Sequence, residues 1–436
     1  MPPYFAFSHS PGLEEMTREA GNVSSVMANS APTFVEGAII VGGGPSGLAV
    51  AACLTMKGVP SLIIEKSDGI GSLWKYKAYD RLHLHIPKQF CELPHYPFPE
   101  DYPMYPNRKQ FVDYLENYFR HFDMRAQFNT KINAAYYDPQ LSCWKVESQP
   151  SSAGSGECVT EYCSRWLIVA SGENAEAYTP DMQGLRDFRG PVLHSSNYKT
   201  GADYMGQRVL VVGCGNSGME IALDLANFNA KPSLVVRSPV HILPREILGV
   251  STFAVAMSMM KRFPLWFTDA LLVVYARAVL GDTTSYGFKR PANGPMTIKC
   301  EQGKTPILDV GTFAKIKSGA IKVCPGVTHL TSQGAKFEND QFAEFDAVVL
   351  ATGYRSNVPR WLSDDGGFFS PEGLPKNPSL GTWKAGRGLF VAGFGRKGIL
   401  GATFDAKYIA EAISDAWSLE SHKHLVSPLK SRYPPP

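Results

Sequence analysis

The stretch "IIVGGGPSGLA" at residues 39–49 joins an apolar run to closely spaced glycines, and it decides the fold of the first part of the chain. A run of this kind is typical of a buried parallel strand. The spacing of Gly42, Gly44 and Gly47 suits a tight turn, a close backbone approach to a pyrophosphate, and a helix packed on the strand. A second apolar strand ends at Glu65, whose carboxylate can accept hydrogen bonds from ribose hydroxyls. The sequence therefore predicts a strand–turn–helix–strand unit that binds a dinucleotide with a free ribose.

A second stretch, "VVGCGNSGME" at residues 211–220, repeats this design. Its three glycines are Gly213, Gly215 and Gly218. At the end of the following strand, Arg237 and Ser238 stand where the first unit has its acid. An acid would repel a 2′-phosphate, whereas arginine can bind one through two parallel hydrogen bonds. The second unit is therefore predicted to bind NADP.

Two dinucleotide sites in one chain suggest an electron path. The nicotinamide cofactor delivers hydride, and FAD at the first site is its natural acceptor. Two further apolar strands run into small-residue turns, Ala170-Ser171-Gly172 and Ala351-Thr352-Gly353, one after each unit. The segment at 388–413 is again a strand, a glycine-rich turn and a helix, which is typical of the part that closes a flavin-binding domain.

We predict an α/β protein with two Rossmann-like dinucleotide-binding domains, in which the NADP-binding domain is inserted into a discontinuous FAD-binding domain. The expected parts are a flexible N-terminal tail at 1–33, the FAD-binding domain at 34–198 and 345–418, the NADP-binding domain at 199–344 and a C-terminal tail at 419–436. The residues expected to contact the cofactors are Gly42, Gly43, Gly44, Pro45, Ser46, Gly47, Glu65, Lys66, Trp74, Ile132, Ala170, Ser171, Gly172, Gly213, Cys214, Gly215, Asn216, Ser217, Gly218, Arg237, Ser238, Ala351, Thr352 and Gly353.

Composition narrows the class of protein. The chain has 436 residues and a formal net charge of +3, which is too small to favour nucleic acid as a partner. Its eight cysteines are scattered without the spacing of a disulfide framework, so reduced thiols and a cytoplasmic location are expected. No metal-ligand spacing and no basic, apolar leader stand out in the sequence.

One apolar segment, at residues 249–281, is a candidate for membrane contact. Lys261, Arg262, Pro264 and Asp269 interrupt it, so it lacks the clean apolar length of a spanning helix. We expect a helical insertion that packs on a neighbour or caps a cleft. The alternative is a peripheral contact with a membrane surface, such as that of the endoplasmic reticulum.

Between the two glycine turns lies "FRGPVLHSSNYK", residues 188–199. The positions of Phe188, Gly190, His194, Tyr198 and Lys199 resemble the signature of the flavin-containing monooxygenases. The motif also lies upstream of the second glycine turn, as in that family. We expect it to shape the domain junction and the NADP cleft rather than to transfer protons.

Within that family the chain looks most like the plant YUCCA group, which converts indole-3-pyruvate to the auxin indole-3-acetic acid. The stretches that carry this likeness are "SLWKYKAYDRLHLHIPKQFCELPHYPFP" (72–99), "YPNRKQFVDYLENY" (105–118), "GNSGME" (215–220), "ATGYRSNVP" (351–359) and "GFGRKGILGATFDA" (393–406). Two residues depart from the usual pattern: Ser171 replaces a threonine, and His85 replaces an asparagine that the wider family places before its G-P-K.

The resemblance implies an NADPH- and oxygen-dependent oxidative decarboxylation of a 2-oxo acid. In that mechanism a hydroperoxide forms at flavin C4a, survives in a dry pocket and attacks the ketone carbon, after which carbon dioxide leaves. The flavin performs the difficult step, so no side-chain nucleophile is required. Trp74, His85 and Lys88 are the candidates for catalytic positions at the flavin edge.

Three other classes stay open at this point. A pyridine-nucleotide disulfide reductase would need a redox cysteine pair, and Cys158 and Cys163 are the only close pair, on opposite faces of an alternating strand. A nucleotide-binding sensor or scaffold would show a stable flavin spectrum and no oxygen uptake. A flavin monooxygenase acting on nitrogen or sulfur, or inserting oxygen beside a ketone, would share the same flavin chemistry.

Overall fold

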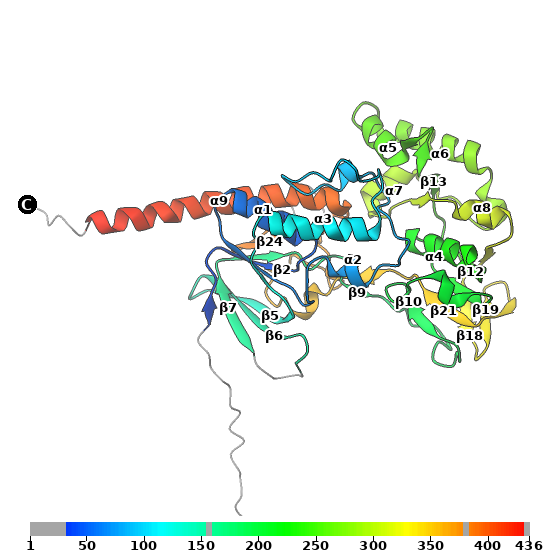
Figure 1. The fold of residues 1–436 in the computed structure, drawn as a ribbon, viewed down its shortest axis with the longest axis horizontal. Helices are drawn as coiled ribbons and strands as arrows, with labels where there is room; N and C mark the ends of the chain where they lie inside the picture. The colour runs from blue at the N-terminus through cyan, green and yellow to red at the C-terminus, as the bar shows by residue number, and fades with distance from the viewer. Residues whose placement is uncertain (1–31, 154–158, 378–382, 431–436) are drawn as a thin grey trace, which may run out of the picture. The chain divides into compact units, whose positions relative to one another are not determined.

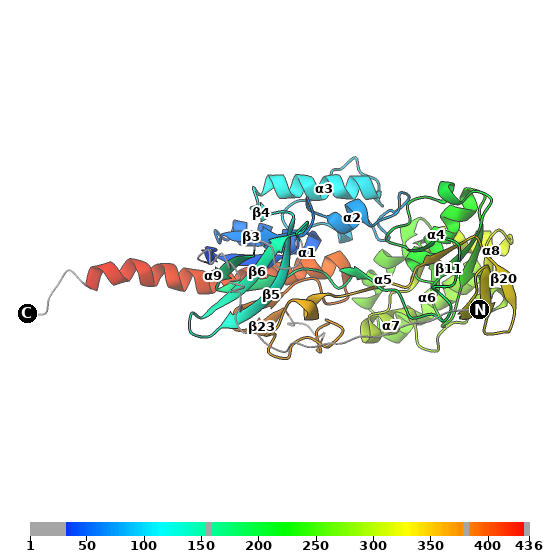
Figure 2. The same cartoon turned by 90° about the horizontal axis from the view of Figure 1, so that it is seen from below.

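The computed structural model describes residues 32–153, 159–377 and 383–430 (Figures 1 and 2). The first glycine turn lies at the carboxyl end of an inner strand of a six-stranded sheet. Its strands, in spatial order, are β23 (Lys384–Gly386), β24 (Leu389–Val391), β8 (Trp166–Val169), β2 (Ala38–Val41), β3 (Ser61–Ile64) and β4 (Ala126–Gln127). All neighbouring pairs are parallel except β23 with β24. This is the open parallel sheet that the first fingerprint predicts.

The apolar residues of β2 separate two packing layers. Ala38 and Ile40 face a helical layer, whereas Ile39 and Val41 face a second sheet. The helical layer contains α1 (Pro45–Met56), α3 (Arg108–His121) and α9 (Gly398–Lys430). The second sheet is antiparallel except for its β1–β7 pair and contains β1 (Thr33–Phe34), β7 (Thr160–Ser164), β6 (Cys143–Pro150) and β5 (Thr130–Asp138). Burial on both faces explains why the strand is continuously apolar.

The second glycine turn lies in a five-stranded parallel sheet with the same layering. Its strands, in spatial order, are β10 (Val192–His194), β21 (Ala347–Leu350), β11 (Arg208–Val212), β12 (Lys231–Val235) and β17 (Lys322–Cys324). One face packs on α4 (Asn216–Asn227) and α8 (Thr312–Lys317), and the other on the antiparallel strands β18 (Val327–Leu330), β19 (Gly334–Phe337) and β20 (Phe342–Glu344). The chain therefore builds the same α/β unit twice.

The sheet pairings correct the predicted domain boundaries. Strands β10 and β21 lie outside 199–344, yet both belong to the five-stranded parallel sheet. There β21 pairs with β11, and β10 pairs with β21. The second unit therefore begins before 199 and ends after 344. The first unit is discontinuous as predicted, because β24 and α9 return to it after the five-stranded parallel sheet is complete.

The chain crosses between the units twice, and the crossings pair with each other. Strands β9 (Glu176–Ala177) and β22 (Tyr354–Arg355), which follow the two small-residue turns, form a two-stranded antiparallel sheet. Each turn is thus both the end of one Rossmann-like sheet and the start of a crossing.

The predicted tails differ in part from the structure. Thr33 already belongs to β1, and residues 1–31 lie outside the described residues. At the other end, helix α9 continues to Lys430, so most of the predicted C-terminal tail is helical. Neither glycine nor proline occurs in residues 402–427, which explains why the helix does not end near 418. Residues 431–436 are outside the description.

The segment 249–281, predicted to be a helical insertion, contains two helices, α5 (Thr252–Met260) and α6 (Leu265–Leu280). Pro264 precedes α6, and Gly281, with φ of +76°, ends it. The name insertion is used below for residues 242–309, which surround these two helices. Its other elements are β13 (Ile242–Pro244), β14 (Glu246–Ile247), β15 (Val250–Ser251), η3 (Thr283–Tyr286), α7 (Pro295–Gln302) and β16 (Ile307–Asp309). Among the described residues, no helix combines the length and apolar character that crossing a bilayer requires.

Candidate active site

The first glycine turn has the geometry of a pyrophosphate cradle. Gly42 has φ of +110°, and a Cβ on Gly47 would lie only 2.0 Å from the carbonyl oxygen of Gly42. A Cβ on Gly44, in contrast, would meet no atom of the described chain within 4 Å. Gly44 is the N-cap of α1, and no described side chain caps that end. The free N–H groups therefore face open space, where an anion can bind.

The second turn reproduces this geometry. Gly213 has φ of +111°, a Cβ on Gly218 would lie 2.0 Å from the carbonyl oxygen of Gly213, and Gly215 again borders open space in the described structure. Cys214, between the glycines, is half-buried, and desolvation raises the pKa of its thiol to about 12. Cys214 therefore stays protonated and is a packing residue rather than a nucleophile.

A cavity of about 260 Å³ opens beside the first turn. Five residues predicted to contact the cofactor line it: Gly42, Glu65, Lys66, Ile132 and Ser171. The Glu65 carboxylate is buried and accepts hydrogen bonds from the N–H groups of Gly43, at 2.7 Å, and Ser67, at 3.0 Å. Ser171 Oγ and Asn357 Oδ1 are buried beside the cavity without a partner in the described residues. Unsatisfied polar atoms next to an anion cradle fit the ribose and adenine of FAD.

The C-terminal glycine segment lies against the first turn. A Cβ on Gly393 would lie 2.1 Å from Ser46 Oγ, and the Gly393 N–H donates to the Asp405 carboxylate at 2.9 Å. Burial raises the pKa of Asp405. The chain at Gly393 thus packs closely on the first turn.

Replacing Gly44 tests the first cradle. Gly44→Val puts a branched side chain into space that the protein leaves empty, so the chain should fold but lose most of its flavin. The measurement is flavin absorbance per mole of purified protein. Gly215→Val, the equivalent change in the second turn, is the matched control and should retain flavin. A folded Gly44→Val protein with full flavin absorbance would contradict the assignment.

Arg237, predicted to recognise a 2′-phosphate at the position of Glu65, lies one residue beyond it, because Val212 pairs with Val235 as Val41 pairs with Ile64. It follows Val236 just beyond β12, and it and Ser238 are exposed. No hydrogen bond or ion pair of the Arg237 guanidinium is found within the described part of the chain. Its donors are thus available to a phosphate next to the second cradle.

Arg237→Ala should lower the catalytic efficiency with NADPH by roughly ten- to a hundredfold, because a charge-assisted hydrogen bond contributes about 1.5–3 kcal/mol. The efficiency with NADH should change little. Steady-state kinetics with both cofactors measure this, with the exposed Arg120→Ala on α3 as the control. Equal losses with NADPH and NADH would overturn the assignment.

The signature at 188–199 joins the two units. His194 contacts the Gly353 carbonyl oxygen through Nε2 at 2.9 Å, and Tyr198 donates to Asp224 on α4 at 2.8 Å. Lys199 Nζ donates to two carbonyl oxygens at the end of α2 (Ser72–Tyr76) and just beyond it. Burial lowers the pKa of His194, which favours its neutral form. These contacts support a structural role at the junction.

The insertion also reaches the first site. Lys299 on α7 donates to the Arg396 carbonyl oxygen at 2.7 Å, and Arg396 donates to Gln302 at the end of α7. Glu173, just after the Ala170-Ser171-Gly172 turn, is half-buried, and desolvation raises the pKa of its carboxyl group. Burial lowers the pKa of Lys299 as well. Charged groups are thus partly desolvated where α7 covers the C-terminal glycine segment.

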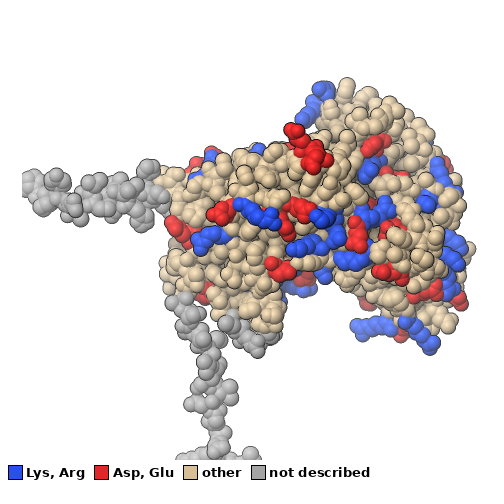
Figure 3. Space-filling model, in the orientation of Figure 1, with Lys and Arg blue, Asp and Glu red and all other residues tan. Residues whose placement is uncertain are grey.

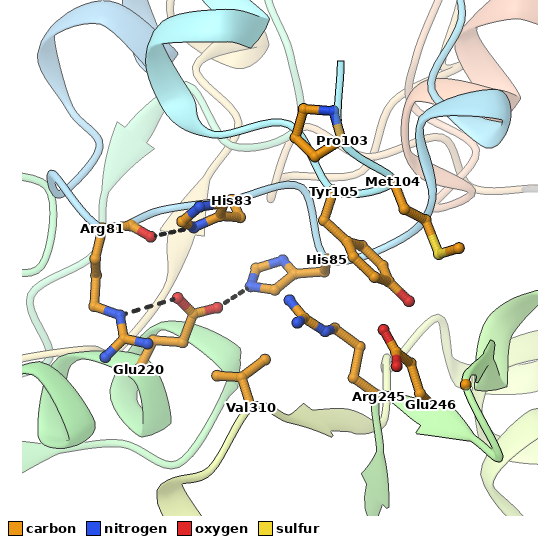
Figure 4. Close-up of a pocket in the computed structure, with 11 residues that line it drawn as sticks. Arg81, His83, His85, Pro103, Met104, Tyr105, Glu220, Arg245, Glu246 and Val310 are labelled. Atoms are coloured by element: carbon orange, nitrogen blue, oxygen red, sulfur yellow. Dashed lines mark hydrogen bonds and ion pairs between the residues drawn. The ribbon is translucent and has the colours of Figure 1, made fainter. Parts of the chain in front are cut away.

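A larger cavity, of about 540 Å³, lies where loops of the first unit meet α4 and the insertion (Figure 4). Its charged and aromatic lining consists of Arg81, His83, His85, Tyr105, Glu220, Arg245 and Glu246. Glu220 is a buried residue of α4, and its carboxylate accepts a hydrogen bond from His85 Nε2 at 2.6 Å. His85 is therefore held by a carboxylate of the other unit.

The structure does not bring the three catalytic candidates together. His85 lines the larger cavity, but Trp74 and Lys88 line neither of the two cavities described here. Trp74 packs edge-to-face on Phe111, with the ring centres 4.5 Å apart. Lys88 donates to the carbonyl oxygens of three residues in the 99–102 loop. The Lys88 ammonium group thus stabilises this loop.

Sequence reasoning missed most of the lining of this cavity. Glu220 follows the second glycine turn directly, and a carboxylate at an otherwise buried helical position was a usable signal. Arg245 and Glu246 form a charged pair inside the apolar stretch "HILPREILG", which was a second signal. Arg81 and Tyr105 stand in polar, loop-forming stretches that gave none.

Comparison with known proteins places the chain in a class. It matches the model of the flavin-binding monooxygenase-like family over residues 36–365, and it belongs to that family. Together with the first cradle, this makes the protein a flavin-dependent monooxygenase. Among curated proteins it is similar to indole-3-pyruvate monooxygenase YUCCA6 of Arabidopsis thaliana, with 52% identity over 88% of this chain and 91% of that one. It is 47% identical to indole-3-pyruvate monooxygenase YUCCA1 of Oryza sativa subsp. japonica, over 88% and 93% of the two chains. The resemblance to the YUCCA group is confirmed.

Solved structures confirm the fold. A flavin-containing monooxygenase from Stenotrophomonas maltophilia has a TM-score of 0.66 at 20% identity, covering 88% of this chain and 99% of that one. Cyclohexanone monooxygenase with bound epsilon-caprolactone also has a TM-score of 0.66, at 16% identity and 89% coverage of both chains. The bacillithiol disulfide reductase Bdr of Bacillus cereus has 0.62 at 19% identity, over 87% and 99%. The fold alone thus does not separate monooxygenases from disulfide reductases.

The cysteines give no support to the disulfide reductase alternative. Cys158 lies outside the described residues. Cys163 on β7 is buried, and its Sγ lies 3.7 Å from that of Cys143 within the antiparallel sheet. Burial raises the pKa of the Cys163 thiol to about 12, so it is not a ready nucleophile.

Proposed function

We propose that the protein catalyses the NADPH- and oxygen-dependent oxidative decarboxylation of indole-3-pyruvate to indole-3-acetic acid. Indole-3-pyruvate, oxygen, NADPH and a proton give indole-3-acetic acid, carbon dioxide, water and NADP⁺. One oxygen atom enters the new carboxyl group and the other leaves as water. The observation that carries this proposal is the family match together with a cavity, beside the helix that follows the second glycine turn, that offers cationic and aromatic side chains.

Bound FAD and NADPH would supply the redox chemistry that activates oxygen. The chain's own residues bind and orient the reactants. Glu65 and the first cradle would hold FAD, and Arg237 with the second cradle would hold NADPH. The hydrogen bond between His85 Nε2 and the Glu220 carboxylate fixes the orientation of the imidazole ring at the cavity wall.

The cavity wall fits an aromatic 2-oxo acid. Pro103, Met104 and Tyr105, from the aromatic-rich 90–118 segment, supply apolar surface, and Gly249 extends the wall from the insertion. Apolar and aromatic walls with a few placed polar groups are typical of small-molecule sites.

Product analysis tests the proposed reaction. Purified enzyme with NADPH and labelled oxygen should convert indole-3-pyruvate to indole-3-acetic acid with one labelled oxygen atom in the new carboxyl group. Phenylpyruvate should also react, because it presents the same 2-oxo acid group on a smaller ring. Indole-3-acetaldehyde, which lacks the carboxylate, should be a poor substrate. Turnover of amines or thioethers with indole-3-pyruvate left intact would contradict the proposal and favour the nitrogen- or sulfur-oxidising alternative.

We also propose that the enzyme works in the cytoplasm at an anionic membrane surface, such as that of the endoplasmic reticulum. The α5–α6 face, defined as Leu248, Val250, Phe263, Trp266, Phe267, Leu271, Val274 and Val279, consists of exposed large apolar side chains. The surface over these helices is largely free of charge in Figure 3. Lys261, Arg262 and Arg277 are exposed beside it, whereas Asp269, the single acid of residues 249–281, is buried. Apolar and basic groups together suit an anionic bilayer.

Sedimentation with phosphatidylserine-containing vesicles tests the membrane contact. Trp266 and Val274 are 69% and 65% exposed, so changing both to serine should not disturb the core. The double variant should lose roughly tenfold or more in vesicle binding, since burying one large apolar side chain contributes about 1.5–3 kcal/mol. Phe342→Ser, on the exposed side of β20, is the control. Equal binding by the double variant and the wild type would refute the contact.

A further inference from the structure

The larger cavity contains two arginines with different surroundings. Arg81 lies near the Glu220 carboxylate, with Nε 4.0 Å from Oε2. Arg245 has no carboxylate within 4.0 Å among the described residues, although Glu246 lines the same cavity. The Glu220 carboxylate is already engaged by His85. Arg245 is therefore the cation of this cavity whose charge is left for a ligand.

The ring of Tyr105 supports the guanidinium of Arg245. The Arg245 Cζ lies 4.1 Å from the centre of that ring, which is within the range of a cation–π contact (Figure 4). Such stacking uses the face of the guanidinium and leaves its N–H edge free. Tyr105 is buried, and burial raises the pKa of its phenol, so the ring is a neutral support.

The backbone of Arg245 is fixed on both sides. Its N–H donates to the Asp309 carbonyl oxygen at 3.2 Å, and its own carbonyl oxygen accepts from the Thr252 N–H at 2.9 Å. The residue thus sits between β13, which pairs with β16, and the start of α5. A cation that is held at its backbone and stacked on a ring is preorganised for a planar anion.

We propose that Arg245, stacked on Tyr105, binds the carboxylate of the 2-oxo acid and determines the preference for acids over uncharged analogues. This inference rests on the proposed function. The guanidinium would grip both carboxylate oxygens, and the apolar wall beside it would take the aromatic ring. Arg237 does not line this cavity, so the 2′-phosphate and the substrate carboxylate have separate arginines.

Binding to the holoenzyme tests the subsite without turnover. Calorimetry compares indole-3-acetate with indole-3-acetamide, which differ only in the charged group. The wild type should prefer the acid, and Arg245→Met should lose roughly ten- to a hundredfold in affinity for the acid while binding of the amide changes little. Arg245→Lys, which keeps the charge but not the planar fork, should retain part of the preference. Arg120→Met, on the surface of α3, is the matched control, and flavin content verifies the fold of each variant.

Kinetics supply the second readout. Arg245→Met should raise the KM for indole-3-pyruvate by a similar factor, whereas the KM for NADPH should not rise. An unchanged acid-over-amide preference in Arg245→Met would overturn the proposal. So would a rise in the KM for NADPH with no rise for the acid, because the anion would then be a cofactor phosphate. If the wild type fails to oxidise indole-3-pyruvate but its acid preference disappears in Arg245→Met, the subsite stands and the proposed reaction fails.

Discussion

The structure depends on two places where a helix approaches a strand turn so closely that no side chain fits between them. A Cβ on Gly47 or on Gly218 would lie 2.0 Å from a carbonyl oxygen of its own turn. This approach fixes the first turns of α1 and α4 beside the ends of β2 and β11. It also leaves Gly44 and Gly215 bordering open space, with free helix N–H groups around them. Both cofactor sites follow from this one steric constraint.

The same constraint explains which features could be predicted from the sequence. The glycine spacing and the apolar strands that flank it are local, so both strand–turn–helix units could be predicted from the sequence. The positions of β10 and β21 were not, because these strands join the second sheet through pairs made with distant segments. Sheet membership at the edge of a domain is a tertiary property, and local patterns carry little information about it.

The larger cavity was even less accessible to prediction. It is assembled from 81–85, 103–105, α4 and the start of the insertion, which are far apart in the chain. Resemblance pointed to His85, but its carboxylate partner comes from the other unit. Lys88 has the charge expected of a catalytic residue, yet three carbonyl oxygens take up its ammonium group. Only the folded loops decide which cations remain available to a ligand.

The most direct test of the account is the anaerobic reaction of the purified holoenzyme with NADPH, followed by flavin absorbance. We propose that FAD occupies the first cradle and NADPH the second, with hydride passing between them. One equivalent of NADPH should therefore bleach one equivalent of flavin in the absence of any other substrate. A flavin that stays oxidised in the presence of excess NADPH would contradict it, because two cradles that do not exchange hydride cannot support the proposed reaction.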